Sequence, residues 1–533
     1  MWPQVYDPVG GSLGLSALVA AIPILVLLVL LGILRTASWI AALAGFAAAM
    51  AVAIFAYGMP AQLALSSALY GAANGLLPIS WIVFTALLLY KVTVETGKFE
   101  IIKNSIGGLT RDQRLQALLI AFAFGAFIEG AAGFGTPVAV AAGMLVGLGF
   151  PPFFAATICL LANTAPVAFG SIGTPLVMLN AVTKLPLASL SANTGRLCAP
   201  ISLFIPAYLV LVMGGFSALR AIAPAAIVCG VAFASVQFFV SSAVGPYLTD
   251  ILGSIAALVA LIALMKVWRP NGVAAADAPD HTPRDAFAAW TPYLFLVILV
   301  LVWGSPATKA VLDRTTVIVP WPGLHNLVQR VAPITPAPSP YGATFTLNLL
   351  SASGTSALFA VFASAIALRV RPGNLARWTG AVAKQLALPI LTIATVVGLA
   401  FVMNYSGQTA TLGLALSATG SAFPFFSPLL GWLGVFLTGS DTSANALFGN
   451  LQIVTAGRLG FNPSLMASAN SAGGVMGKMI SLSSIAIAVA AAQMPRTEEA
   501  RLFRFTLRHS VFLASVMGLL TLFYAYVAPG WVR

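Results

Sequence analysis

The chain has 533 residues, of which 59% are hydrophobic and only 7% are charged. Soluble domains carry about 25% charged residues, so these side chains cannot cover a water-soluble protein of this length. The composition therefore indicates a polytopic membrane protein whose first partner is the lipid bilayer. The 33 prolines and 48 glycines are typical of kinked and broken helices rather than of a membrane β-barrel.

The formal net charge is +13, and the basic residues stand in short loops between apolar runs. This distribution is typical of positive-inside topology signals, so no nucleic-acid partner is expected. The three cysteines lie in apolar stretches without paired spacing, which predicts neither disulfides nor a metal site. Nucleotide-binding, dinucleotide-binding and His/Cys metal motifs are not found in the sequence. We expect no cofactor and no enzyme activity.

Taken in chain order, the apolar segments predict an all-α protein with roughly 12–14 transmembrane helices, some of them broken or re-entrant. The first run lacks a basic flank and exceeds a signal-peptide core, so we interpret it as a retained helix. The predicted segments are 13–34, 38–57, 62–95, 115–129, 136–148, 153–165, 168–182, 197–214, 219–243, 247–266, 287–303, 343–368, 383–404, 410–420, 425–438, 443–456, 463–476, 478–493 and 510–528. The polar stretches 268–284 and 305–341 are expected to be extramembrane connectors.

Short apolar segments cluster at 115–182 and again at 410–493, and the two regions match in sequence. Short interrupted segments at corresponding places of two halves are a sequence indicator of a transporter binding site. The matches run in order at a nearly constant offset: Leu77-Pro-Ile with Leu388-Pro-Ile, Thr96-Gly with Ser406-Gly, Gly125-Ala-Phe with Gly434-Val-Phe, Leu148-Gly-Phe-Pro-Pro with Leu459-Gly-Phe-Asn-Pro, Ala162-Asn-Thr-Ala with Ala469-Asn-Ser-Ala, and Gly170 with Gly477.

The basic flanks of the two repeats lie at opposite ends. Segment 91–114 holds five Lys or Arg residues and its counterpart 402–425 holds none, whereas 57–76 holds none and 368–387 holds four. By the positive-inside rule the repeats are inverted, as alternating access requires. The predicted organisation is N-terminal scaffold helices at 1–60, a first repeat at 61–185, scaffold helices and connectors at 186–370, a second repeat at 371–495, and a C-terminal helix at 496–533.

Each repeat holds one isolated carboxylate. Glu129 is the only charged residue between Arg114 and Lys184, and Asp441 is the only one between Lys384 and Arg458. A charged group costs at least about 2.5–3.5 kcal/mol in a membrane helix, so such residues usually face a polar cavity. Because a carboxyl group removed from water holds its proton more tightly, both residues are candidate proton carriers. A structural role, such as capping a half-helix, remains the alternative.

Helix breaks beside these carboxylates predict sites for an anion. Thr136-Pro137 is predicted to be an N-cap followed by a proline at the first helical position, and Thr174-Pro175 repeats this pattern. Thr442 or Ser443 is expected to cap the helix after Asp441. Free N–H groups at such starts bind anions. The candidate substrate-binding residues here are Thr136, Thr174, Ser443 and Asn445, and the glycines expected to allow close approach are Gly130, Gly133 and Gly135. Helix packing is the other interpretation of these glycines.

Matched polar pairs supply further candidates for substrate binding. Asn163-Thr164 precedes a proline and Asn470-Ser471 precedes two glycines, so both pairs are predicted at unwound points. Interhelical hydrogen bonding is the alternative role. Lys478 is the only charged residue between Arg458 and Arg496, and it is either a counter-ion for the substrate or a partner of Asp441 or Glu129.

The run Phe124–Gly143, FGAFIEGAAGFGTPVAVAAG, resembles the lactate permease family of bacterial secondary transporters. The likeness continues through Ala162–Pro166 and Gly170–Pro175 to Gly439–Asn445, and with the length and repeat layout it covers nearly the whole chain. The resemblance implies uptake of L-lactate, D-lactate or glycolate with a proton, in the bacterial inner membrane, by a multi-pass protein that can form a homodimer. A sodium-coupled carboxylate transporter of similar architecture is the alternative, and a channel or a membrane-embedded structural subunit is a third.

Overall fold

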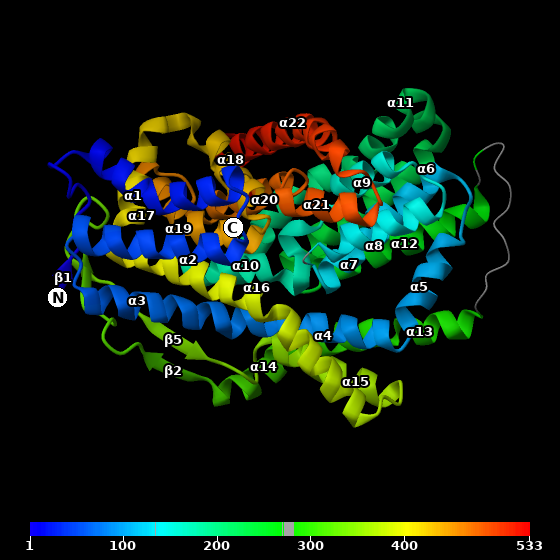
Figure 1. Ribbon diagram of the computed structural model, residues 1–533, viewed down its shortest axis with the longest axis horizontal. Helices are drawn as coiled ribbons and strands as arrows, with labels where there is room; N and C mark the ends of the chain where they lie inside the picture. Colours follow the sequence, from blue (N-terminus) through cyan, green and yellow to red (C-terminus); the bar gives the residue numbers. More distant parts are fainter. Residues whose placement is uncertain (134, 269, 271–281, 533) are drawn as a thin grey trace.

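The computed structural model describes residues 1–133, 135–268, 270 and 282–532, and within them the chain is almost wholly helical (Figure 1). The expected class, an all-α polytopic membrane protein, is thereby confirmed. Much of the polar connector 268–284 lies outside the described residues.

The helices of the first half are short and repeatedly interrupted. They are α1 (Leu13–Leu28), α2 (Ser38–Ala51), α3 (Ala61–Asn74), α4 (Trp81–Glu95), α5 (Lys98–Gly107), α6 (Gln113–Gln116), α7 (Gly125–Ala131), α8 (Thr136–Gly147), α9 (Pro152–Ala162) and α10 (Gly170–Thr183). Wider π-helical turns continue four of them, at Val29–Ile33, Val52–Ala56, Gly75–Ser80 and Ala117–Phe124. Thus α6 and α7 form one segment with the turn between them.

The remaining helices include several long ones. They are α11 (Leu187–Ala243), α12 (Thr249–Val267), α13 (Pro283–Gly304), α14 (Pro306–Leu312), α15 (Ser353–Ala367), α16 (Pro372–Ser406), α17 (Gln408–Leu416), α18 (Phe423–Thr438), α19 (Asp441–Leu459), α20 (Pro463–Lys478), α21 (Leu482–Ala491) and α22 (Glu499–Tyr526). Short 3-10 turns lie at Val167–Phe169, Asp313–Thr315, Ser417–Ala422, Arg496–Glu498 and Pro529–Trp531.

Two small sheets lie at one end of the molecule, around the predicted connector 305–341 (Figure 1). Strand β3 (Val328–Arg330) pairs in parallel with β1 (Trp2–Pro3) and antiparallel with β4 (Ser339–Pro340). Strand β2 (Val317–Pro320) pairs antiparallel with β5 (Thr344–Leu347). The sheet that contains β1 fixes the N-terminus to the connector.

Eleven helices in the described residues are long and apolar enough to cross a membrane, or 12 if the bent pair α9–α10 counts as one span. The count of 12 equals the lower limit of the predicted range of roughly 12–14 transmembrane helices. Their outer faces are apolar: Phe55 and Phe216, for example, are 86% and 79% exposed. Contiguous exposed apolar surface of this kind is stable against lipid and not against water.

The expected breaks of the first half are present. Helix α7 ends beside Gly133 and α8 begins at Thr136, with left-handed φ angles of 61° at Gly133 and 79° at Gly135. The pair α9–α10 is bent by 61°, and within α10 Ser171, Ile172 and Gly173 are left-handed, so regular helix starts at Thr174. The break spans the predicted unwound pair Asn163-Thr164.

The second half differs from the expectation at Asn470-Ser471, which was predicted to be unwound. Helix α20 runs without interruption through this pair, and the chain breaks only after Lys478. The following Gly473 serves close packing instead, because a Cβ there would lie far inside van der Waals contact with the backbone of Pro428 on α18. The packing interpretation of glycines thus holds at this position.

Corresponding glycines have corresponding conformations in the two halves. Gly97 and Gly407 are left-handed and precede α5 and α17, and Gly149 and Gly460 are left-handed and precede α9 and α20. This agreement favours the predicted internal repeat.

Candidate functional site

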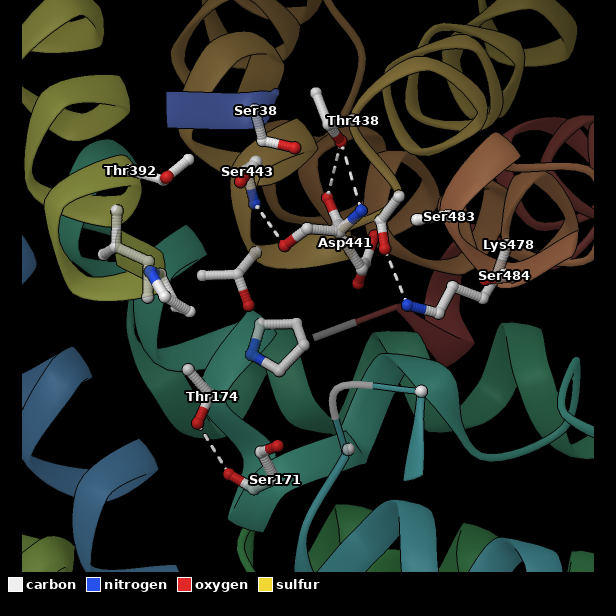
Figure 2. Close-up of a pocket in the computed structure, with 18 of the residues that line it drawn as sticks. Ser38, Ser171, Thr174, Thr392, Thr438, Asp441, Ser443, Lys478, Ser483 and Ser484 are labelled. Atoms are coloured by element: carbon white, nitrogen blue, oxygen red, sulfur yellow. Dashed lines mark hydrogen bonds between the residues drawn. The ribbon is translucent and has the colours of Figure 1, made fainter. Parts of the chain in front are cut away.

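Glu129 and Asp441, far apart in sequence, line the same cavity of about 320 Å³ (Figure 2). Glu129 lies on α7 and is 4% exposed, whereas Asp441 is the first residue of α19 and is 3% exposed. Among the described residues that line the cavity, the third charged one is Lys478, at the end of α20. The cavity therefore combines two carboxyl groups and one amine inside a helical core.

Glu129 is held by residues of the break between α9 and α10. Its Oε2 accepts a hydrogen bond of 3.0 Å from Nδ2 of Asn163. A Cβ on Gly170 would lie 2.6 Å from Oε1, so a glycine is required where the chain passes over the carboxyl group. Gly133 is also required, because its φ is left-handed and a Cβ there would collide with Oγ of Ser171.

Asp441 has an arrangement of the same kind in the second half. Its Oδ2 accepts hydrogen bonds from Oγ of Ser471, at 2.6 Å, and from Nδ2 of Asn445, at 3.5 Å. Its Oδ1 has no hydrogen-bond partner in the described structure. Gly474 faces this oxygen closely, as Gly170 faces Glu129.

Lys478 lines the same cavity as the two carboxyl groups, and in the described residues it forms no close ion pair with either. Its Nζ donates a hydrogen bond of 2.6 Å to the carbonyl oxygen of Gly439 (Figure 2). Within the described residues no carboxylate oxygen lies within 4.0 Å of Nζ, yet Lys478 interacts electrostatically with both Glu129 and Asp441. Because an ammonium group has three donors, it retains capacity for another anion.

Four helix N-termini converge on the cavity, two from each half. They are the start of α8 at Gly135, the regular part of α10 from Thr174, the start of α19 at Ser440, and the first turn of α21, which contributes Ser483. Helix N-termini present free N–H groups and a partial positive charge of about +0.5. The cavity is thus suited to an anion.

Two predicted caps are wrong. Residue 135 is the N-cap of α8, so Thr136 is the first helical residue and makes no capping bond. The cap of α19 is Ser440, whose Oγ accepts a hydrogen bond of 3.3 Å from the backbone N–H of Ser443, and neither Thr442 nor Ser443 is the cap. Because the left-handed Gly135 and Gly439 end the preceding turns, each helix begins one to three residues earlier than the predicted cap indicates.

The predicted residues separate into those that line the cavity and those that support it. Lining residues are Glu129, Gly135, Thr174, Asp441, Ser443 and Lys478. Asn163, Asn445 and Ser471 bind the carboxyl groups from behind, and Asn470 donates to Asn445. Thr136, Thr164, Gly130 and Gly133 do not line the cavity.

Sequence reasoning missed several other neutral residues that line the cavity. They include Ser38 and Trp39 of α2, Thr392 of α16, Ser171, Thr438 and Ser484. Residues of α2 and α16 reach the cavity only through tertiary packing, and no local sequence pattern predicts such packing. For α21 a signal existed, since Ser481 lies three residues before Ser484 and its Oγ accepts a hydrogen bond from that residue's N–H.

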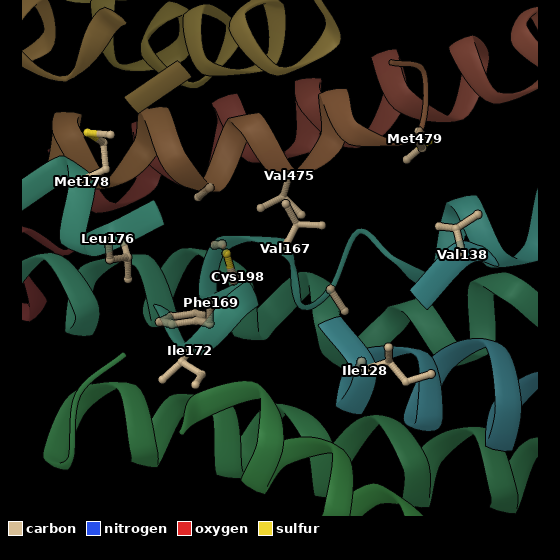
Figure 3. Packing of buried hydrophobic residues seen from close by; sticks show 14 of the residues in the cluster. Ile128, Val138, Val167, Phe169, Ile172, Leu176, Met178, Cys198, Val475 and Met479 are labelled. Carbon is tan, nitrogen blue, oxygen red and sulfur yellow. The ribbon is translucent and has the colours of Figure 1, made fainter. Parts of the chain in front are cut away.

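Apolar side chains close the region around the polar groups. Ile128, Phe169, Ile172, Leu176 and Val475 are at most 1% exposed and belong to one buried cluster that joins both halves (Figure 3). A charged group in such surroundings is expensive unless it is paired or protonated.

A polytopic helical protein with a buried polar cavity at the helix breaks of two halves has the architecture of a membrane transporter. A sequence model described as L-lactate permease matches residues 16–528. The chain therefore belongs to the L-lactate permease family, and the resemblance seen in the sequence is confirmed.

Relatives within this family align over almost the full length. The L-lactate permease of Bacillus subtilis (strain 168) is 45% identical, covering 98% of this chain and 98% of its own. The glycolate permease GlcA of Escherichia coli (strain K12) is 44% identical, covering 99% of each. Among solved structures, the Alcanivorax borkumensis YdaH transporter aligns with 87% of this chain and 87% of its own at 15% identity, with a TM-score of 0.44.

Proposed function

We propose that the protein imports a small 2-hydroxymonocarboxylate, namely L-lactate, D-lactate or glycolate, together with a proton by alternating access. The proposal is carried by one observation: four helix N-termini and Lys478 face two buried carboxyl groups in a single cavity. Membership of the permease family and relatives named for lactate and glycolate support this substrate class. On this proposal the protein is a transporter and not an enzyme.

Charge neutrality of the buried site accounts for proton coupling. If Lys478 is an ammonium group, one ionised carboxylate neutralises it and the other carboxyl group holds a proton. A bound monocarboxylate adds one negative charge to the cavity. Neutrality then requires one more proton, so each substrate anion enters with a proton on Glu129 or Asp441.

The neutral residues around the cavity are proposed to orient the substrate. Thr174 and Ser443 stand at helix starts beside the cavity, where their hydroxyl groups are suited to a 2-hydroxyl or carboxylate group. Asn163, Asn445, Asn470 and Ser471 are proposed to hold the two carboxyl groups in place rather than to touch the substrate.

The proposal also divides the chain into a moving core and a scaffold. The repeats 61–185 and 371–495 form the moving core, and 1–60, 186–370 and 496–533 supply the scaffold, in a bacterial cytoplasmic membrane. A homodimer of such chains is part of the proposal. Alternating access follows from repeats that exchange conformations around the central cavity.

Lactate uptake into proteoliposomes with an imposed pH gradient tests this function. We expect the wild type to accumulate lactate against its gradient when the outside is acidic. Glu129→Gln and Asp441→Asn should lower this accumulation about a hundredfold if each group takes part in proton transfer. The matched control is Glu95→Gln, which removes a carboxylate that pairs with Lys91 outside the cavity.

Two further conditions separate the alternatives. Proton–lactate symport is electroneutral, so an imposed potential, worth about 2.3 kcal/mol per charge per 100 mV, should leave accumulation unchanged. Uptake that requires sodium at fixed pH would instead establish the sodium-coupled alternative. Undiminished accumulation by both Glu129→Gln and Asp441→Asn would refute the proton-carrying roles, and absence of saturable counterflow in the wild type would indicate a channel.

A further inference from the structure

A third buried carboxyl group of the helical core, Asp250, is not among the described residues that line the cavity. It is the second residue of α12 and is 1% exposed. In the described structure neither of its carboxyl oxygens has a hydrogen-bond partner. It does not cap its helix either, because the N-cap position is Leu248 and makes no side-chain bond. An acid at this place therefore contributes no visible bond to the fold.

Asp250 lies against the residue that follows Glu129 in α7. A Cβ on Gly130, the residue after Glu129, would lie 2.8 Å from Cβ of Asp250 and 3.1 Å from the backbone nitrogen of Ile251. Only glycine allows α7 and α12 to approach so closely. The carboxyl groups of Asp250 and Glu129 interact electrostatically, although Glu129 alone of the two lines the cavity.

The turn before α12 also supports the helix break on the other side of Glu129. A Cβ on Gly173, within the left-handed part of α10, would lie 2.9 Å from the backbone of Pro246. The beginning of α12 therefore touches both elements that shape the cavity around Glu129, namely the end of α7 and the break in α10.

Among the described residues, the charged group that acts on Asp250 is another carboxyl group and not a cation. Helix α12 packs against α7, α11 and the turn Ala117–Phe124. The titratable groups that face it are Glu129 from α7 and the thiol of Cys198 from α11, while the turn Ala117–Phe124 carries only apolar side chains. An ionised Asp250 would be a buried charge without compensation, and beside an ionised Glu129 it would also be repelled.

We propose that Asp250 is a second proton-binding site, which passes the coupling proton to and from Glu129 without contacting the substrate. In the transfer step the O–H bond of Asp250 breaks and an O–H bond forms on a carboxylate oxygen of Glu129. Asp250 then regains a proton from water when that side of the protein opens. Glu129 faces the substrate, and Asp250 supplies its proton from the scaffold side. This inference rests on the proposed proton coupling.

The test compares two transport assays for Asp250→Asn, which keeps the size of the side chain and removes the acid. Net lactate accumulation driven by a pH gradient requires the protein to release the proton and bind it again in every cycle. Counterflow exchanges labelled for unlabelled lactate, and the protein keeps its proton during this exchange. We expect net accumulation to fall about a hundredfold and counterflow to stay at the wild-type rate. Ser254→Ala, one turn further along α12, is the matched control and should change neither.

Each other outcome contradicts the inference. If Asp250→Asn lowers accumulation and counterflow together, the residue is structural, and if it changes neither, it carries no proton. Should Asp250→Asn fail to fold, the same assays are made with Asp250→Glu. We then expect an altered pH dependence of net accumulation with normal counterflow. A wild-type pH dependence would refute the proposal. Absence of proton-driven accumulation in the wild type would instead overturn the proposed function itself.

Discussion

At the scale of single residues, Lys478 is the group whose role the geometry defines most sharply. It uses one hydrogen bond on the carbonyl oxygen of Gly439 and faces the cavity with its remaining donors. A hydrogen bond to a charged group contributes about 1.5–3 kcal/mol, so Lys478→Gln should raise the KM for lactate at least about tenfold, with a smaller change in kcat. Initial uptake rates in proteoliposomes measure both constants.

The control for this prediction is Lys184→Gln, because Lys184 stands over the ring of Tyr70 and does not line the cavity. Its KM is expected to equal that of the wild type. A wild-type KM for Lys478→Gln would show that the amine only supports the Gly439 carbonyl.

The isolated charges Glu129, Asp441 and Lys478 could be found from the sequence because a charge in an apolar stretch needs a polar environment. The structure places all three on one cavity. Ser38 and Thr392 could not be found, since hydroxyl groups are common in membrane helices and only tertiary packing selects these two. Asp250 was not identified from the sequence because it stands near the end of an apolar segment, where charged residues are common.

At the scale of elements, the start of the segment α6–α7 offers a test of a charge just outside the candidate membrane span Gln113–Ala131. Oδ1 of Asp112 accepts a 2.8 Å bond from the backbone N–H of Arg114, and Oδ2 pairs with its guanidinium at 2.6 Å. Burial raises the pKa of Asp112, but the hydrogen bonds and charge of Arg114 outweigh it and lower the pKa below the ordinary 3.8. A carboxyl group whose pKa is lower in the folded state than in the unfolded state stabilises the fold above its unfolded-state pKa. This stabilisation is lost as the pH falls through the folded-state pKa.

Asp112→Asn should therefore destabilise the protein by about 0.5–1 kcal/mol near neutral pH, because asparagine caps as well as aspartate but cannot form the ion pair. The difference should shrink as the pH falls through and below 3.8. Thermal unfolding of the detergent-solubilised proteins at both ends of this range measures it. A difference of constant size would mean that the charge contributes nothing.

Helix starts were predicted within a few residues, because Pro137, Pro175 and Pro463 mark first turns in sequence. The break predicted at Asn470 is not found in α20. The glycines of the Asn-Ser-Ala-Gly-Gly sequence there allow α20 to pack closely against α18 instead. Glycine allows both an unwound backbone and a close approach between helices, and only the neighbouring helix decides between them.

At the scale of the whole molecule, the membrane class followed from composition alone, whereas the cavity did not. The sequence repeat places Asp441 within two or three alignment positions of Glu129, but an alignment does not say that two corresponding residues lie close together in space. They meet because the breaks of both halves lie against each other, with α10 packed on α19 and α20. The meeting of four helix N-termini from two halves is thus a property of the tertiary fold.

The inversion of the two repeats predicts on which side of the membrane their ends lie. In Figure 1, α5 and α15 lie toward one end of the molecule and α3 and α17 begin toward the other. Single cysteines at Asn104 and Gly373, in the basic flanks of the two repeats, should react only from the cytoplasmic side with a membrane-impermeant maleimide. Gln62→Cys and Ala418→Cys, in the flanks without Lys or Arg, should react from outside.

The native chain serves as the background for this labelling, because Cys159, Cys198 and Cys229 are at most 2% exposed and buried thiols are inert. Labelling of intact cells against inverted vesicles separates the two sides. Reaction of Asn104→Cys and Gly373→Cys from opposite sides would mean that the repeats are parallel. An exchange of conformations between inverted halves would then no longer explain how one cavity opens alternately to each side of the membrane, and transport would require a movement of a different kind.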